Sequence, residues 1–414
     1  MATIVLSPSN VVASPWVGGH FWVYLNYALG LRGLGCDVYW LEHVQPTGDP
    51  RADAACLSLF HDRMCRHGLG DRYALYTSGP SGRGDPAHLV TLNRPSAEVD
   101  AIVRRADLLL NFHYAMDPGF LARFRRTALV DIDPGLLQLW MAAGQLPVAR
   151  HDRYLTIGET VGTPGARFPD CGLAWTQIRS PIWLPAWPSV ASPTARAFTT
   201  VSSWWGGRGG GEWVVLGEDA YYDNNKRASF LDFVDVPRRT DQTLELALSV
   251  SDGVPIDGPG SAAGLRQDSD LAAGTGFPSE AQDMELLRRH GWRLRRARDV
   301  AGSPEAFQAY VQGSRGEFSC AKPSCMAFQN AWISDRTLCY LASGKPVVVQ
   351  DTGPSAFLPH GLGMFRFRSL EQAAEALATV AADYEKQSRA AREIAEAYFD
   401  ARVVLPPLLD AALG

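Results

Sequence analysis

The amino-terminal part of the chain alternates between short apolar runs and an amphipathic helix, and few folds accommodate this pattern. Residues 2–6 are apolar, residues 7–19 form a loop that contains the Gly18–Gly19 pair, and residues 20–34 carry apolar side chains at helical spacing. Gly35 is placed to end that helix, and a second apolar run follows at residues 37–41. A strand, a helix and a strand with short connections predict a parallel sheet covered by helices.

The alternation continues through the first half of the chain. Residues 107–112, 128–132 and 154–157 are apolar runs that predict buried strands. A polar residue follows each run: His113, Asp133 and Glu159. Ligands of open α/β sheets bind at the carboxyl ends of the strands, so we expect these residues to border a crevice.

A proline-rich stretch separates two halves of similar character. Residues 181–193 contain four prolines and no hydrophobic periodicity, which is typical of a linker. A chain of 414 residues is long enough for two domains. We therefore expect an α/β protein with two Rossmann-like domains, whose parallel sheets face a central cleft. The expected parts are a first domain at residues 1–180, a linker at 181–196, a second domain at 197–390 and a helical tail at 391–414.

Composition and charge argue against several classes of protein. The formal net charge of −5 is unlike that of a strongly basic nucleic-acid-binding protein. No apolar run approaches the roughly 18 residues of a membrane span. Seven scattered cysteines favour free thiols in a reducing compartment, and the first residues do not resemble a secretory signal. We expect a cytoplasmic protein with no nucleic-acid partner and no membrane span.

The start of a predicted helix in the second half carries the strongest chemical signal. Ser334 or Asp335 is placed to cap this helix, which ends at Gly344. Free backbone N–H groups, the positive end of the helix dipole, Arg336 and the Thr337 hydroxyl would then converge on one point. Such a point is an anion site suited to a diphosphate.

A strand at residues 346–350 follows this helix and leads into a polar turn. Asp351, Thr352 and Gly353 lie at its carboxyl end, where a carboxylate can hydrogen-bond sugar hydroxyls. An ordinary capped helix with a core strand and a turn would show the same pattern, and the residues alone do not separate the two interpretations.

The order of these motifs resembles the carboxyl-terminal half of GT-B glycosyltransferases. The capped helix is followed by A-x-G-x-P-V-V-V at residues 342–349, an acidic turn with glycine, an H-G-x-G segment at 360–363 and a helical tail. The resemblance implies a nucleotide-sugar donor on the second domain, an acceptor on the first, and a tail that crosses back to the first domain. The early Gly18–Gly19 loop also suits that superfamily, and Gly19 becomes a candidate for contact with the donor.

The resemblance further implies that cations and helix dipoles, rather than a bound metal, neutralise the leaving diphosphate. The candidate cations besides Arg336 are Lys226, Arg315 and Lys322; Arg208 is a further basic residue of the second half. No cofactor is expected beyond the nucleotide-sugar co-substrate. Each of these side chains also fits an ordinary solvated surface charge.

Three residues of the first half are candidates for the group that accepts a proton from the acceptor. His20 follows the glycine pair at the start of the first helix and is the first choice, although it also fits a helix-capping histidine. His113 and Asp133 lie at strand ends, and Asp133 can orient or replace the histidine. Asp133 also belongs to a turn signature, Asp-Pro-Gly.

The sequence therefore predicts a glycosyltransferase that moves a sugar from a nucleotide diphosphate to a hydroxyl or amine of a small, natural-product-like molecule. A nucleotide-sugar epimerase of the same architecture remains an alternative. A nicotinamide-dependent oxidoreductase is another: the first strand–helix–strand unit favours it, with Glu42 at a plausible ribose-binding position, and the absence of the G-x-G-x-x-G spacing opposes it. A non-catalytic protein that binds sugar nucleotides is a further alternative. Two D-x-D strings, at residues 131–133 and 268–270, are not expected to bind a metal, and neither are Cys56, His61, Cys65 and His67.

Overall fold

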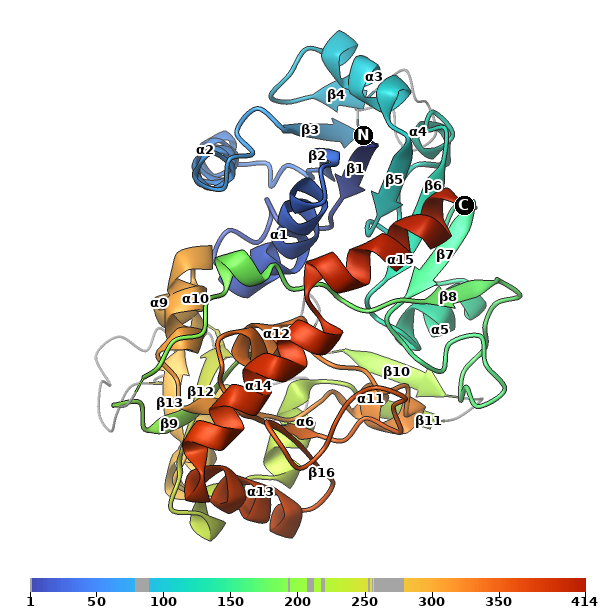
Figure 1. Cartoon of the computed structure of the whole chain (residues 1–414). Coiled ribbons are helices and arrows are strands. Elements are labelled where there is room, and N and C mark those ends of the chain that lie inside the picture. The colour runs from blue at the N-terminus through green and yellow to red at the C-terminus, as the bar shows by residue number, and fades with distance from the viewer. Residues whose placement is uncertain are drawn as a thin grey trace.

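Two parallel β-sheets, one from each half of the chain, form the centre of the computed structural model (Figure 1). The structure describes residues 2–78, 89–192, 194–206, 212–216, 220–251, 254, 256 and 279–414. Helices lie against both sheets. The predicted α/β architecture with two Rossmann-like domains is confirmed.

The first sheet contains eight strands within the described residues, in the order β4-β3-β2-β1-β5-β6-β7-β8, and only the β3–β4 pair is antiparallel. The strands are β1 (Thr3–Ser7), β2 (Asp37–His43), β3 (Tyr73–Ser78), β4 (Leu89–Thr91), β5 (Leu108–Asn111), β6 (Thr127–Asp131), β7 (Arg153–Thr156) and β8 (Trp175–Gln177). The helices of this half are α1 (Gly18–Gly33), α2 (Pro50–Arg66), α3 (Ser96–Arg105), α4 (Pro118–Leu121) and α5 (Leu136–Ala142). Strands β1 and β6 are buried along their whole length, because helices cover both faces of a parallel sheet.

The second sheet is parallel throughout, in the order β13-β12-β9-β14-β15-β16. Its strands are β9 (Ala197–Ser203), β12 (Thr243–Ser249), β13 (Arg293–Arg296), β14 (Gly316–Ser319), β15 (Val347–Gln350) and β16 (Met364–Phe367), and a separate hairpin consists of β10 (Trp213–Leu216) and β11 (Ala220–Asp223). The helices are α6 (Lys226–Asp232), α8 (Glu280–Arg289), α9 (Ala297–Ala301), α10 (Pro304–Gln312), α11 (Pro323–Phe328), α12 (Asp335–Ala342), α13 (Leu370–Ala382), α14 (Tyr384–Tyr398) and α15 (Ala401–Leu413).

The chain crosses between the two domains at two places that are hydrogen-bonded to each other. The N–H of Ile182 donates to the carbonyl oxygen of Phe399, and the N–H of Ala401 donates to that of Ile182, at 2.8 and 3.0 Å. Beyond this crossing, α15 lies along α1 of the first domain (Figure 1). Gly30 of α1 permits the close approach, because a Cβ there would lie 2.6 Å from Ala401 Cβ.

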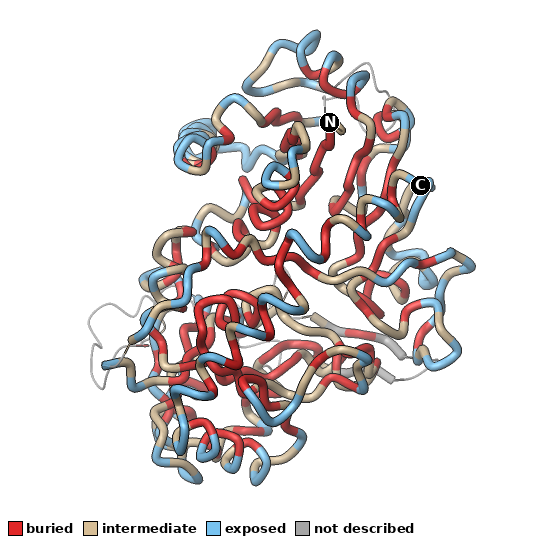
Figure 2. Tube along the Cα trace, in the orientation of Figure 1, coloured by how far each residue is buried: buried red, intermediate tan, exposed pale blue. Residues whose placement is uncertain are grey.

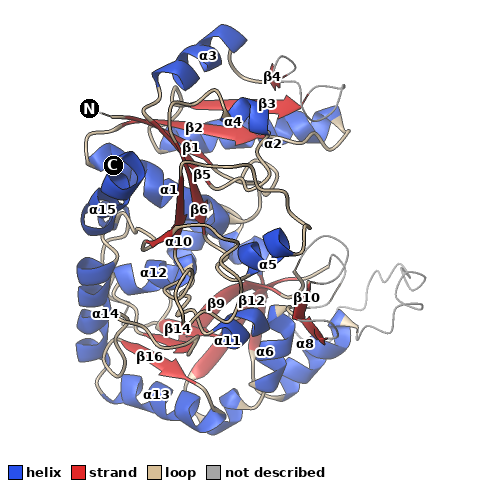
Figure 3. Cartoon of the chain, turned by 90° about the vertical axis from the view of Figure 1, so that its right-hand side faces the viewer, coloured by secondary structure: helices blue, strands red, loops and turns tan. Residues whose placement is uncertain are grey.

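Buried residues are concentrated in the strands and in the helix faces that cover them (Figure 2). The same pattern continues between the domains, where the rings of Trp22 in α1 and Trp187 in the linker pack with centroids 4.8 Å apart. Helices α14 and α15 lie one above the other along one side of the molecule, and α13 lies across its lower end (Figure 3). Of the helices that the structure describes, none is both long and apolar enough to cross a lipid bilayer.

Candidate functional site

Lys226 lies at the start of α6, at the carboxyl edge of the second sheet, and its charge is poorly compensated. Its side chain is buried, and Nζ lies 5.9 Å from the centroid of the Trp332 ring. Nζ donates no hydrogen bond to a residue in the described part of the chain. Burial, together with the charges of Arg336 and Lys322, lowers the pKa of Lys226 to about 7. A bound anion would stabilise its charged form.

Lys322 lies beside Lys226, between β14 and α11, and it already has a partner. Its Nζ is 2.6 Å from Oε2 of Glu212, which precedes β10. Burial opposes the charge of Lys322, but the carboxylates of Glu212 and Asp133 raise its pKa. Lys322 is therefore a fixed ammonium ion that faces a carboxylate of each domain.

Arg336, in the first turn of α12, is held by hydrogen bonds to residues of the second domain. Its guanidinium donates to Oε1 of Glu317, to the carbonyl oxygen of Val201 and to Oγ of Ser319, at 2.8, 2.8 and 2.6 Å. Glu317 is fully buried, so this ion pair lies inside the domain. From the sequence, Arg336 was predicted to contact the diphosphate directly. In the structure its guanidinium donates its hydrogen bonds to protein groups instead, and its positive charge lowers the pKa of Lys226.

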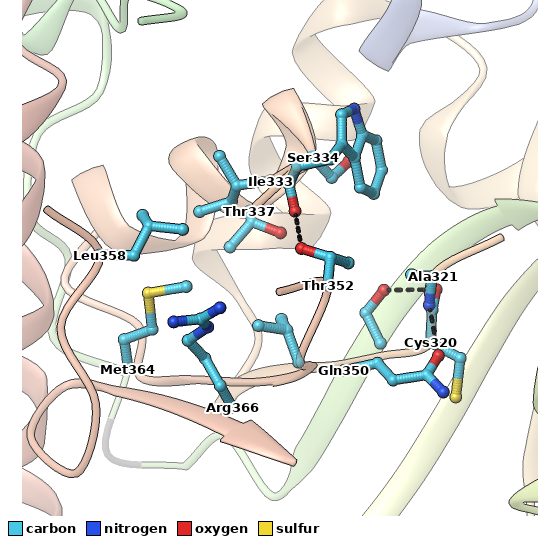
Figure 4. Close-up of a pocket in the computed structure, with 13 residues that line it drawn as sticks. Cys320, Ala321, Ile333, Ser334, Thr337, Gln350, Thr352, Leu358, Met364 and Arg366 are labelled. Atoms are coloured by element: carbon cyan, nitrogen blue, oxygen red, sulfur yellow. Dashed lines mark hydrogen bonds between the residues drawn. The ribbon is translucent and has the colours of Figure 1, made fainter. Parts of the chain in front are cut away.

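A pocket opens next to the start of α12, between the carboxyl ends of β14 and β15 (Figure 4). Its cavity volume is about 20 Å³, which is room for about one water molecule. Ser334 and Thr337 line one side and Thr352 another, while Trp332 closes part of the wall. The Thr352 hydroxyl donates to the carbonyl oxygen of Trp332 at 2.6 Å, which joins the end of β15 to the segment before α12. Ser334 is the N-cap residue of α12, but its side chain makes no capping hydrogen bond.

His20 lies in the first turn of α1, at the carboxyl edge of the first sheet. Its Nε2 is 2.8 Å from the carbonyl oxygen of Ser9. A carbonyl oxygen only accepts hydrogen bonds, so Nε2 carries the proton and Nδ1 is left with a lone pair. Burial lowers the pKa of His20, although the nearby charge of Asp133 opposes this shift. At neutral pH His20 is therefore an uncharged base.

Asp133 follows β6 and faces the second domain. Tyr114 Oη is 3.3 Å from its carboxylate. Burial raises the pKa of Asp133, while the charges of Lys322 and His20 lower it. The charge of Asp133 thus acts on His20 in its own domain and on Lys322 of the second domain.

The other acid of this turn, Asp131, has a structural role. It is fully buried, and its carboxylate accepts hydrogen bonds from the Gln138 amide, the Thr156 hydroxyl and the Asp133 N–H at 2.9, 2.8 and 3.0 Å. Burial raises its pKa to about 7. These bonds fix the backbone that carries Asp133.

His113 lies after β5, two strands away from His43 of β2 in the same sheet. The two imidazole rings are nearly parallel, with centroids 5.5 Å apart. The N–H of His113 donates to Asn111 Oδ1 at 2.9 Å. His113 therefore belongs to the same edge of the first sheet as His20 and Asp133, with His43 as a neighbour that the sequence did not single out.

Two predicted donor residues, Arg315 and Asp351, contact other side chains of the protein, and a third, Asp335, is partly withdrawn from solvent. Arg315 precedes β14 and so lies at the opposite end of that strand from Lys322, where its guanidinium covers the Tyr384 ring. Asp351 forms ion pairs with Arg366 and Arg368, which leaves neither carboxylate oxygen free of a cation. Asp335 is half-buried at the first residue of α12, and desolvation raises its pKa to about 6.

The predicted glycines allow close packing within the protein. A Cβ on Gly19 would lie 2.9 Å from the Phe307 ring of α10, and a Cβ on its neighbour Gly18 would lie 2.0 Å from the carbonyl oxygen of Ser303. The glycine pair thus lets α1 approach the second domain, whereas the sequence suggested approach to a ligand. Gly353, with a φ of +125°, packs on the backbone of Gln329.

Glu42 does not fit the role of a ribose-binding acid. Its side chain is 1% exposed, and it accepts hydrogen bonds from the Val12 N–H and from Trp40 Nε1 at 2.8 and 2.9 Å. Burial raises the pKa of Glu42 to about 7. The carboxylate fixes the loop after β1, so the nicotinamide alternative loses its candidate ribose-binding acid.

We expect Glu42→Gln to destabilise the protein by about 1–3 kcal/mol, because its amide nitrogen would face an N–H donor inside the fold. Urea unfolding at pH 7.5 measures the effect. Glu393→Gln, at an exposed position of α14, is the matched control and should change stability by less than about 0.5 kcal/mol. Equal stability of the two variants would contradict the structural role of Glu42.

The second D-x-D string, with Asp268 and Asp270, and the basic residue Arg208 are not among the described residues. Among the described residues, no group of three or more His, Cys, Asp or Glu side chains could hold a metal ion. His61 instead contacts Tyr73 Oη and Cys65 Sγ, at 2.8 and 3.5 Å.

Three residues of the site carried no recognisable signal in the sequence: Glu212, Tyr114 and Asn330. Glu212 reaches Lys322 across 110 positions of the chain, and Asn330 reaches Pro134 across 196. Neither residue belongs to a short motif. Tyr114 directly follows His113, and only its hydrogen bond to the Asp133 turn distinguishes it from a core tyrosine.

No model of a known protein family matches the sequence, and no curated protein matches it either. Solved structures do match over nearly the whole chain. An alpha-glucosyltransferase in complex with UDP and a 13-mer DNA containing a HMU base has a TM-score of 0.58 at 10% identity, and covers 100% of this chain and 99% of that one. HepE of Anabaena, in complex with UDP-glucose, has a TM-score of 0.56 at 13% identity, with 99% of each chain covered.

Sucrose-phosphate synthase of Thermosynechococcus elongatus is a third match, with a TM-score of 0.50 at 10% identity and coverage of 99% of this chain and 98% of that one. Similarity at this level of identity concerns the fold. The chain has the GT-B fold, in which two Rossmann-like domains face each other.

Proposed function

We propose that this protein is a glycosyltransferase that uses a UDP-sugar as donor. The observation that carries the proposal is the state of Lys226: a buried ammonium beside two further cations, with no acceptor for its hydrogen bonds among the described residues. A diphosphate supplies the negative charge that this cluster lacks. Both the alpha-glucosyltransferase and HepE, which share the fold, are described in complex with UDP or UDP-glucose.

In this proposal the second domain holds the donor. Lys226 and Lys322 contact the diphosphate, and Arg336 supports them from below through its charge. The nucleoside lies at the mouth of the pocket between β14 and β15, and this pocket, which Trp332, Ser334, Thr337 and Thr352 line, widens to admit the base. As the bond between the sugar and the diphosphate breaks, negative charge grows on the leaving oxygen, and cations already fixed in place stabilise it without reorganisation.

The first domain activates the acceptor. A hydroxyl group of the acceptor gives its proton to Nδ1 of His20, and its oxygen forms a bond to the anomeric carbon of the sugar. The bond from that carbon to the diphosphate breaks, and UDP leaves with the electron pair. Asp133 stabilises the imidazolium that forms, because a nearby carboxylate favours the charged histidine. An amine acceptor would follow the same course.

We further propose a small, natural-product-like acceptor and a cytoplasmic location. The net charge of −5 does not favour a polyanionic acceptor. The DNA in the alpha-glucosyltransferase complex is a property of that protein. All seven cysteines are free thiols, which supports a reducing compartment.

A donor and acceptor panel tests this function. The protein is incubated with UDP-, dTDP- and GDP-sugars, with and without a mixture of small hydroxyl and amine acceptors, and products are identified by mass spectrometry. We expect a glycosylated acceptor and free UDP. A changed sugar that remains bound to UDP in the absence of acceptor would instead identify an epimerase.

We expect transfer to need no divalent metal, because Lys226 and Lys322 supply the positive charge that a metal ion would otherwise bring to the diphosphate. Initial rates are compared in excess EDTA and in added Mg²⁺ or Mn²⁺, the ions that would stabilise a leaving diphosphate. Rates should agree within about twofold. Activity that disappears in EDTA and returns only with the metal would contradict this expectation.

A further inference from the structure

Asn330 connects the two domains at the candidate site. It lies between α11 and α12 in the second domain and is fully buried. Its Nδ2 donates to the carbonyl oxygen of Pro134 in the first domain at 2.7 Å, and its backbone oxygen accepts from the N–H of Glu159 at 3.1 Å. Its Oδ1 accepts from the N–H of Trp332 at 3.2 Å. Asn330 thus contacts the two turns that follow β6 and β7.

The backbone around Asn330 has an uncommon conformation. Gln329 and Ala331 have φ values of +52° and +57°, in the left-handed region that side-chain-bearing residues rarely adopt. Each costs free energy, and such residues persist where the surrounding structure fixes them. Two contacts do so: the N–H of Ala331 donates to the carbonyl oxygen of Thr352 at 3.2 Å, and Gly353 packs directly on the Gln329 backbone. Thr352 and Gly353, at the edge of the pocket, therefore help to hold the backbone that carries Asn330.

The turn on the opposite side is shaped to receive this segment. Gly135, with a φ of +90°, packs against the buried ring of Phe328, and a Cβ at that position would lie 2.3 Å from the ring. One residue further back in this turn is Pro134, which accepts the Asn330 hydrogen bond, and next to it is Asp133. The carboxylate of Glu159 adds a further connection between the domains, because it accepts from the Ala356 N–H at 2.8 Å.

From this arrangement we infer that Asn330 is a positioning residue, which holds the Asp133 turn of the first domain in place over the donor cations of the second. The inference rests on the proposed function, since it assigns Asp133 a place in the transfer reaction. Asn330 touches neither substrate; it acts through the backbone of Pro134. A displacement of about 1 Å in a reacting group can cost about 10²-fold in rate, so one interdomain hydrogen bond can control kcat.

The test is Asn330→Asp, which keeps the shape of the side chain and replaces its N–H donor with a carboxylate oxygen. We expect kcat for sugar transfer to fall about 10- to 100-fold at pH 8. The Kd for UDP, measured by calorimetry, should stay within about twofold of wild type because the donor contacts lie within the second domain. As the pH is lowered toward 5.5, the ratio of variant to wild-type kcat should rise, because protonation of the introduced carboxylate restores a donor to the Pro134 carbonyl oxygen.

The matched control is Asn26→Asp. Asn26 is also buried, and its amide donates to the Trp22 carbonyl oxygen and accepts from the Trp183 N–H, away from the cleft. Thermal unfolding of both variants reports the loss of stability that any buried Asn→Asp change causes. If Asn330→Asp matches this control in kcat, or if its Kd for UDP rises by the same factor as kcat falls, the positioning role is wrong.

Hydrogen exchange separates failure of this inference from failure of the proposed function. Wild-type protein that binds no UDP and transfers no sugar would refute the function. The interdomain connection is then judged by exchange at the backbone N–H groups of Glu159 and of residues 133 and 135–138. Faster exchange there in Asn330→Asp than in Asn26→Asp supports the connection, and equal exchange overturns it.

Discussion

His20→Ala is expected to lower kcat for sugar transfer about 10²- to 10⁴-fold, the usual contribution of a general base. The Kd for UDP should remain within about twofold of wild type, because the donor contacts lie on the other domain. His61→Ala is the control, since His61 is bonded to Tyr73 on the outer part of the first domain. Initial rates with saturating UDP-sugar and calorimetry with UDP measure the two quantities.

The pH dependence of the same reaction gives a second readout. Burial lowers the pKa of His20, so the neutral form persists below the ordinary histidine value of about 6.5. We expect kcat to be level near neutral pH and to decline only in the more acidic range, as the imidazole becomes protonated before it can act. If His20→Ala keeps more than about a third of wild-type kcat, His20 is not the general base. Asp133 is then the candidate for that role, and Asp133→Asn should lower kcat more than His20→Ala does.

Lys226→Met is expected to raise the Kd for UDP about 10- to 100-fold. A hydrogen bond from a charged group to an anion contributes about 1.5–3 kcal/mol, and each 1.4 kcal/mol corresponds to a tenfold change in Kd. Methionine fills a similar volume in the contact with Trp332, so the fold should be retained. Lys386→Met, at an exposed position of α14, is the matched control. Equal affinities of the two variants would remove Lys226 from the donor site.

The low pKa of Lys226 predicts that UDP binding takes up protons, and this direction can be tested. Without ligand its pKa is about 7, so a substantial fraction of the side chains is neutral at pH 7.5. A bound diphosphate raises this pKa, and binding must therefore take up protons near neutral pH. The affinity for UDP should fall as the pH rises above 7. Calorimetry in buffers of different ionisation enthalpy should show this proton uptake in wild type and lose most of it in Lys226→Met.

The fold could be predicted from the sequence because parallel strands that are buried on both faces appear as continuous apolar runs. The runs at β1, β5 and β6 predicted the centre of the first sheet, and the run at β15 predicted an inner strand of the second. The positions of His20, Asp133, Lys226 and Lys322 could also be anticipated, since each lies in a turn after a strand or at the start of a helix.

The interactions between side chains could not be anticipated in the same way. Arg336 was expected to face a bound anion, but it forms an ion pair with Glu317, a residue of β14 that no sequence motif marks. The Gly18–Gly19 pair was predicted to let a ligand approach, but the space beside both glycines is occupied by Ser303 and by Phe307 of α10. Asn330 had no local signal, because its partner lies on the other domain and becomes adjacent only when both domains have folded.

The most direct measurement of the central claim is a crystal structure of the protein with UDP. We expect the diphosphate oxygens within hydrogen-bond distance of Nζ of both Lys226 and Lys322, with the uridine at the mouth of the pocket between β14 and β15, which is wider than in the free protein. The His20 and Asp133 side chains should lie across the cleft from the terminal phosphate. UDP bound instead on the first domain, beside the glycine pair and Glu42, would contradict the claim.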